Sequence, residues 1–310
     1  MKLGKRALIP SFADTHIHFA SYAAFHAGLN VMEAESNEEI LEMLGNFAKT
    51  CKDKLIIGFG SVDAAMLEPY ENSDEKGVLY YTDEQVTEFC KKANRAGMQI
   101  EVHAIGDAAF KQATEALKAA LEDYPRDDHR HAIIHACLPT KEGIEICEQY
   151  GILLPVQSAF IDWPQEPDER LQEILGERSA KLNPFRDYLN HNLILGCGSD
   201  GPCTEPDPIM WIHKACNHNV PEQALTVEEA LKMCTYNGYY TTFDEKERGS
   251  LEVGKAADMV ILSENPFAVE KEHLGEIKVE RLLLQGRPYK KLHQNPIAQV
   301  LTGMFRKTGC

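Results

Sequence analysis

Two histidines separated by one residue, His16 and His18, end an apolar stretch that begins at Ile9. Side chains alternate between the two faces of a β-strand, so both imidazoles would point the same way, and Asp14 would join them in a regular strand. Neutral imidazoles at this spacing can bind one divalent cation together. The pattern therefore predicts one wall of a metal site, with two surface histidines at a strand end as the alternative.

Three further residues suited to metal chemistry lie near the ends of predicted strands. They are His103 in residues 99–105, His135 in residues 131–136 and Asp200 in residues 193–200. Helices are predicted between the strands, and this alternation indicates parallel βαβ units. A β/α barrel carries its chemistry at the C-terminal strand ends. We therefore predict that these residues converge with His16 and His18 on one metal site.

Composition limits the classes of partner. The 310-residue chain carries a net charge of −16, which disfavours nucleic acid or an anionic membrane as the main partner. Its nine cysteines are scattered and form no Cys-x-x-Cys pair, which favours reduced, mostly buried thiols in a cytoplasmic protein. No apolar run has the length of a membrane span, and the N-terminus does not have the pattern of a signal peptide.

Capping signals and turns divide the chain. Capping boxes predict helices that start at Ser36, Thr82 and Thr226, and a further helix is predicted over residues 140–150. From Arg248 onward, turn-rich sequence and short strands predict part of a small β-sandwich. We expect a barrel over residues 9–247, a partial sandwich from residues 1–8 and 248–290, and a tail over 291–310.

The motifs together resemble the amidohydrolase superfamily, in the branch of metal-dependent hydrolases similar to N-substituted formamide deformylase. The matching segments are PSFADTHIH at 10–18, VHAIGD at 102–107, IHA at 134–136, NPFR at 183–186, GSD at 198–200 and GSLEVGKAAD at 249–258. The resemblance implies an α/β fold, a TIM-type β/α barrel with an attached β-sandwich, and hydrolysis at a C–N or related bond. It implies that His16, His18, His103 and His135 are metal ligands, and that Asp200 is both a ligand and the general base.

Two departures from the family pattern concern residues 18–99. The family's bridging lysine would fall at Leu55, and Lys54 is one residue out of register, so on a strand it would face the other way. Only 80 residues separate His18 from Gln99, whereas three and a half barrel units of about 31 residues need about 110. We therefore expect a shortened barrel. The chain would then be a naturally shortened homologue, a protein with an engineered internal deletion, or an obligate homo-oligomer.

Without the lysine, we expect one metal ion held by His16, His18, His103 and Asp200, with His135 as a further ligand or a hydrogen-bond donor to substrate. A second metal would need another bridging group. The ligand types favour zinc, while iron or manganese also fit. Metal-activated water would then attack a small-molecule amide, N-formyl or cyclic amide substrate, and His135 would help to stabilise the oxyanion.

Two other functions compete with this one. A shortened homologue could retain the metal site as a non-catalytic binding or regulatory protein, and the missing middle segment favours that alternative. A metal phosphoesterase is disfavoured because no phosphate-binding loop is present.

Several other polar residues have weaker signals. Asp107 is predicted to be a helix N-cap, and Asp258 to hold a turn in the sandwich. Arg186 could bind substrate or be structural, and Asp162 and Trp163 could line a pocket.

Overall fold

The computed structural model describes residues 3–18, 29–30, 58–59 and 64–289, with single residues 43 and 46. Lys54, Leu55, most of the predicted helix 36–50 and the tail beyond residue 289 lie outside the described residues. Within the described part, no helix is long and apolar enough to cross a membrane. The described cysteines are free thiols, and all but Cys203 are buried.

Four parallel strands lie side by side in chain order. They are β4 (Glu101–Ala104), β5 (Ala132–His135), β6 (Leu154–Val156) and β7 (Leu195–Cys197). Strand β4 pairs with β5, Ala132 bridges to Leu153 ahead of β6, and β6 pairs with β7. Another parallel pair joins β2 (Leu29–Asn30) to β3 (Gly58–Phe59). This is the order expected of successive βαβ units, and closure into a barrel stays a prediction.

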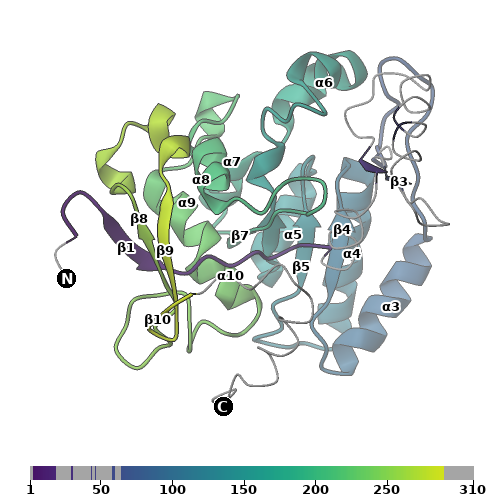
Figure 1. Ribbon diagram of the computed structural model, residues 1–310. Helices are drawn as coiled ribbons and strands as arrows, with labels where there is room; N and C mark the ends of the chain where they lie inside the picture. Colours follow the sequence, from purple (N-terminus) through teal and green to yellow (C-terminus); the bar gives the residue numbers. More distant parts are fainter. Residues whose placement is uncertain are drawn as a thin grey trace.

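Helices connect the strands and cover them (Figure 1). They are α3 (Asp83–Arg95), α4 (Asp107–Asp123), α5 (Lys141–Tyr150), α6 (Asp168–Leu175), α7 (Phe185–Asn190), α8 (Pro208–Cys216), α9 (Val227–Cys234) and α10 (Tyr236–Thr241), with 3₁₀ turns η1 (Ser158–Phe160), η2 (Gly176–Lys181), η3 (Pro221–Gln223), η4 (Pro266–Ala268) and η5 (Lys271–Glu276). Their apolar faces bury Phe110, Leu117 and Trp211 against strand residues such as Ile133 and Leu154. Burial of this apolar surface is the main stabilising term for the fold.

Within the described residues, local capping signals were accurate with one exception, and the predicted helix start at Ser36 lies outside them. The capping boxes at Thr82 and Thr226 are both formed, which confirms those helix starts. Gly151 ends α5 in the left-handed conformation that glycine adopts easily. The N-cap prediction for Asp107 is wrong: Gly106 is the N-cap, and Asp107 Oδ1 accepts a hydrogen bond from Leu67 N at 2.7 Å. A carboxylate in the first helical turn can face away from the helix, and that of Asp107 instead holds the loop that contains Leu67.

A small antiparallel sheet joins the two ends of the described chain. Its order is β1 (Ala7–Pro10), β8 (Met259–Leu262), β9 (Val279–Leu284), β10 (Arg287–Pro288). Figure 1 shows β1 in purple beside β8, with β9 on the other side of β8. The predicted strand toward His18 therefore ends early, at Pro10, and β1 spans the predicted domain boundary between residues 8 and 9. Asp258 accepts from Arg248 Nε and Gln285 N, which confirms its role in holding a turn.

A buried histidine, His131, connects α3 to the strand layer. Its Nδ1 accepts from Ile100 N, so Nε2 carries the proton and donates to Asn94 Oδ1 at 3.0 Å. The Asn94 amide in turn donates to Ala120 O and Tyr124 O. Burial, followed by the nearby charges of His129 and Arg126, lowers the pKa of His131 to about 3. The imidazole is therefore neutral in the folded protein.

This pKa predicts a loss of stability in acid. The unfolded chain binds a proton at His131 near pH 6.5, whereas the folded chain does so only near pH 3, so stability falls as the pH drops through this window. The slope from this residue is up to about 1.4 kcal/mol per pH unit. In urea unfolding between pH 7 and 4, His131→Gln should flatten the slope. The control His273→Gln, at an exposed site, should not flatten the slope. An unchanged slope in His131→Gln would contradict the lowered pKa of His131.

Candidate metal centre

Three of the predicted ligands meet at one point. His16 Nε2 and His18 Nε2 each lie 3.1 Å from Asp200 Oδ1. One ligand atom from each of the three residues lies within 4.8 Å of the other two. Donor atoms this close can share one cation, since zinc–nitrogen and zinc–oxygen bonds are about 2.0–2.2 Å long.

Backbone pairing brings these residues together. Thr15 N donates to Cys197 O, Asp200 N donates to His16 O, and His18 N donates to Gly201 O. The segment after β1 thus runs alongside the end of β7. Gly198 is required there, because a Cβ at this position would lie 2.5 Å from His16 N. These backbone hydrogen bonds place His16 and His18 opposite Asp200, although residues 11–18 do not form a regular strand.

Asp14 does not join the ligand cluster. Its carboxylate accepts from Ser199 N at 2.9 Å and from Ser199 Oγ at 2.6 Å. The chain from Ser11 to His18 is not a regular strand, so the alternation that would have placed Asp14 beside the histidines does not hold. Asp14 instead anchors the residue that precedes Asp200.

His103 and His135 form an adjoining pair. The His103 and His135 ring centroids are 4.3 Å apart, and the His135 and His16 centroids are 5.3 Å apart. Neither residue belongs to the set of donor atoms within 4.8 Å of one another. All five predicted residues therefore lie in one cluster, but the three closest donors are His16, His18 and Asp200.

Two residues of the cluster have an unusual backbone. His135 has φ +71° and Asp200 has φ +53°, both in the left-handed region. Such conformations cost of the order of 1–3 kcal/mol each in non-glycine residues. The Asp200 turn is closed on both sides, because Asp200 N donates to His16 O and Asp200 O accepts from Cys203 N. The fold thus holds both side chains in positions that an unconstrained chain would avoid.

Several buried polar atoms in the cluster lack hydrogen-bond partners. Among the described residues they include His16 Nε2, Asp200 Oδ1 and both ring nitrogens of His135. The 3.1 Å contacts of His16 Nε2 and His18 Nε2 with Asp200 Oδ1 do not have hydrogen-bond angles. This is expected when the three atoms point toward a common position between them. Unpaired buried polar groups are costly. A cation at that point would satisfy His16 Nε2 and Asp200 Oδ1, so the residues present fit a metal site.

The charge states also suit a cation. Burial raises the pKa of Asp200, but the close His16 contact and the charges of His135, His16 and His18 outweigh it and lower the pKa overall. Burial lowers the pKa of His135 to about 3 and that of His103 below its usual value. Asp200 is therefore an ionised carboxylate, and His103 and His135 are neutral imidazoles, which are the forms that bind metals.

Comparison with known proteins decides the family. A model of the amidohydrolase family matches residues 59–289. The chain belongs to the amidohydrolase family. Among curated relatives, YtcJ of Bacillus subtilis is 30% identical over 74% of this chain, and N-substituted formamide deformylase of Arthrobacter pascens is 26% identical over 68%. These alignments cover 44% and 40% of the relatives, so the chain spans less than half of their length.

Solved structures of similar fold include metal-dependent hydrolases. A hydrolase from Pyrococcus furiosus has a TM-score of 0.57 at 21% identity, with 80% of this chain and 59% of that chain covered. A zinc-bound adenosine deaminase from Xanthomonas campestris has a TM-score of 0.51 at 15% identity, with 93% and 68% covered. The resemblance to the amidohydrolase superfamily expected from the sequence is confirmed, and the chain has the mixed α/β fold of these structures.

The other candidate residues have structural partners. Arg186 Nη1 and Nη2 each donate to a Glu229 carboxylate oxygen at 2.7 Å, which supports the structural alternative. Asp162 pairs with Lys214 at 2.7 Å on the exposed side of its loop. Trp163 is buried, and its ring lies 5.0 Å from that of Phe160. Sequence reasoning did not single out Gln157, although its place at the end of β6 matches that of His135 at the end of β5.

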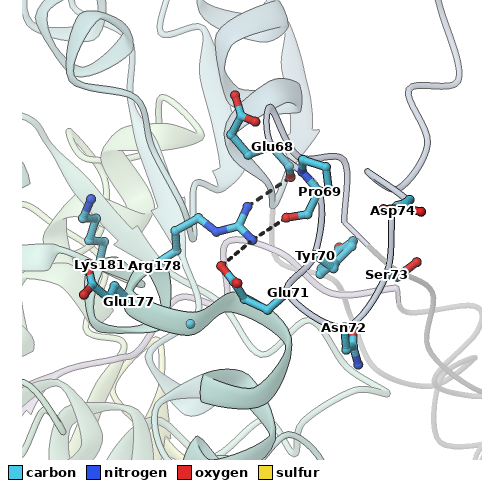
Figure 2. Close-up of a pocket in the computed structure, with 11 residues that line it drawn as sticks. Glu68, Pro69, Tyr70, Glu71, Asn72, Ser73, Asp74, Glu177, Arg178 and Lys181 are labelled. Atoms are coloured by element: carbon cyan, nitrogen blue, oxygen red, sulfur yellow. Dashed lines mark hydrogen bonds and ion pairs between the residues drawn. The ribbon is translucent and has the colours of Figure 1, made fainter.

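A cavity of about 1030 Å³ lies elsewhere in the chain, between residues 68–74 and 176–181 (Figure 2). Arg178 crosses it and donates to Glu68 O at 3.0 Å and to Pro69 O at 2.6 Å, with Glu71 at 3.7 Å. The same loop is closed by a Met66 N to Lys76 O hydrogen bond and is fixed to Asp107. No metal-cluster residue lines this cavity, so we interpret Arg178 as a clamp on the loop of residues 64–77.

Zinc titration of single variants would check the metal centre. His16→Ala, His18→Ala and Asp200→Ala should each weaken zinc binding by at least about a hundredfold, since even outer partners of a ligand contribute 10–100-fold. His191→Ala, at an exposed histidine paired with Glu148, is the control. Competition with a chromophoric chelator gives the affinities, and wild-type affinity in all three cluster variants would rule the centre out.

Hydrogen exchange would check the Arg178 clamp. Arg178→Ala removes two charged hydrogen bonds, which contribute about 1.5–3 kcal/mol each. Local opening of the 64–77 loop should therefore rise at least about tenfold. Lys181→Ala, on the same cavity wall, is the control. Equal exchange in the Arg178 variant and wild type would show that other contacts hold the loop.

Proposed function

We propose that this chain hydrolyses a carbon–nitrogen bond of an amide, N-formyl or cyclic amide small molecule with the aid of one divalent cation. The observation that carries the proposal is the convergence of His16, His18 and Asp200, with buried donor atoms that lack partners. Membership of the amidohydrolase family and the likeness to a formamide deformylase support the reaction class.

His16, His18 and Asp200 would hold the cation, with His103 and His135 beside them. When bound, the cation supplies a Lewis acid that lowers the pKa of water and polarises a carbonyl. The donor set of imidazoles and a carboxylate favours zinc, with iron and manganese as alternatives. We propose one metal ion per chain, because only His16, His18 and Asp200 have donor atoms close enough together to share an ion, and His103 and His135 lie outside that set.

Asp200 is the proposed general base. Its lowered pKa keeps the carboxylate ionised, so it can accept a proton from the attacking water and later deliver it to the leaving nitrogen. His135 is fully buried beside His16, and a ring N–H there can donate to the developing oxyanion. Burial of both groups removes competing water from the reacting atoms and strengthens these interactions.

A non-catalytic, metal-binding regulatory role is the second candidate. It is favoured by the short segment between His18 and Gln99, where 80 residues stand in place of the about 110 that three and a half barrel units need. Both candidates share the metal centre, so hydrolysis itself must separate them.

We also propose that the strands close into a barrel, that copies of the chain assemble as a homo-oligomer, and that the protein is cytoplasmic.

The Asp200→Asn variant tests the base. Asparagine retains an oxygen ligand but loses the proton acceptor, so hydrolysis should fall about 10²–10⁴-fold, while zinc stays bound more nearly as in wild type. A screen of amide and N-formyl compounds on zinc-loaded protein supplies the substrate. Asp162→Asn, on an exposed loop, is the matched control. Wild-type turnover by Asp200→Asn would exclude this mechanism, and absence of all turnover in wild type would favour the regulatory role.

A further inference from the structure

Strand β4 carries two polar side chains on one of its faces. Val102 and Ala104 pack into the main hydrophobic core, and Ala104 is fully buried. Side chains alternate along a strand, so Glu101 and His103 face the other way, and both are exposed. The His103 ring lies 4.3 Å from that of His135. Glu101 is therefore one strand pleat from the candidate metal centre, on the face that carries it.

The Glu101 carboxylate has no protein partner among the described residues, since it takes part in no hydrogen bond and no ion pair there. Loss of hydration raises the pKa of Glu101, although part of the side chain reaches solvent, and the charge of nearby His16 partly offsets this rise. The carboxylate thus lies close to one of the three candidate ligands, without a positive group to compensate for its lost hydration.

A cationic group of a ligand matches this position. A carboxylate binds ammonium and guanidinium groups by charge-assisted hydrogen bonds, which are stronger than neutral ones. Asp200, the other carboxylate at the cluster, is already in contact with His16 and His18. With one divalent cation bound, Asp200 and Glu101 together balance its charge, so no net positive charge of the centre would repel a cationic substrate.

We propose that Glu101 is a specificity-determining residue that binds an ammonium or other cationic nitrogen group of the substrate. This inference rests on the proposed function and narrows its substrate class to amides that carry a positive charge. Residues two apart on a strand are separated by about 6.6 Å, so the cationic nitrogen lies about that far from the groups bound beside His103. A neutral substituent at this place leaves the carboxylate unpaired, and an anionic one is repelled by it.

Three para-substituted acetanilides test the inference independently of hydrolysis. At neutral pH the 4-aminomethyl compound is a cation, the 4-methyl compound is uncharged and the 4-carboxylate is an anion. Affinities are measured by calorimetry on the zinc-loaded full chain. Wild type should bind the cation at least about tenfold more tightly than the uncharged compound, since one charge-assisted hydrogen bond contributes about that factor, and should bind the anion most weakly.

The variant Glu101→Gln keeps the side-chain shape and removes the charge. It should bind the cation about tenfold more weakly and the uncharged compound as wild type does, so the preference disappears. The control Glu115→Gln, at an exposed position of α4, should keep the preference. Thermal unfolding of each variant checks that the fold is intact, and zinc titration checks that the metal centre is unchanged.

The outcomes separate this inference from the proposed function. Equal binding of the cationic and uncharged compounds by wild type would overturn the inference. Weaker zinc binding by Glu101→Gln, or loss of one of two zinc ions bound by wild type, would assign Glu101 to the metal centre and overturn it too. Selective binding of the cation without hydrolysis of any amide would sustain the inference and reject the proposed catalysis; hydrolysis of amides without this selectivity would do the reverse.

Discussion

The candidate site depends on one backbone interaction, the pairing of residues 15–18 with the end of β7 and the residues after it. Thr15 and His18 donate to carbonyls on the β7 side, and Asp200 donates back to His16 O. These bonds set the two imidazoles 3.1 Å from Asp200. Because the paired segments lie far apart in the sequence, the site forms only in the folded protein, which couples metal binding to folding.

Buried polar atoms explain why the cluster is suited to ligands. The helices and strands exclude water from His135, Gln157 and Asp200, and protein partners do not replace it at all of their atoms. In the buried His131–Asn94 network, by contrast, the side-chain polar atoms pair with one another and with backbone groups. The contrast marks the ends of β5, β6 and β7 as places where stability has been given up in favour of binding, as is common at functional sites.

Local sequence signals predicted much of the secondary structure. Thr82 and Thr226 start their helices through side-chain bonds to residues three positions on, and Gly151 ends another by its freedom to adopt positive φ. These signals act within a single turn, so a sequence contains them completely. Asp107 shows the limit, because its carboxylate bonded to Leu67 N, in a loop forty residues away, and left the cap to Gly106.

The sequence by itself determined the family and the identity of the candidate ligands, because residue types and strand-end positions define the chemistry that a site can perform. Tertiary structure alone decided that β1 pairs with β8, that Asp14 binds Ser199, and that His16, His18 and Asp200 form a closer set than His103 and His135. It also revealed Gln157. The physical reason is that each of these outcomes is a contact between distant segments, whose geometry is fixed by packing and backbone pairing that local patterns do not encode.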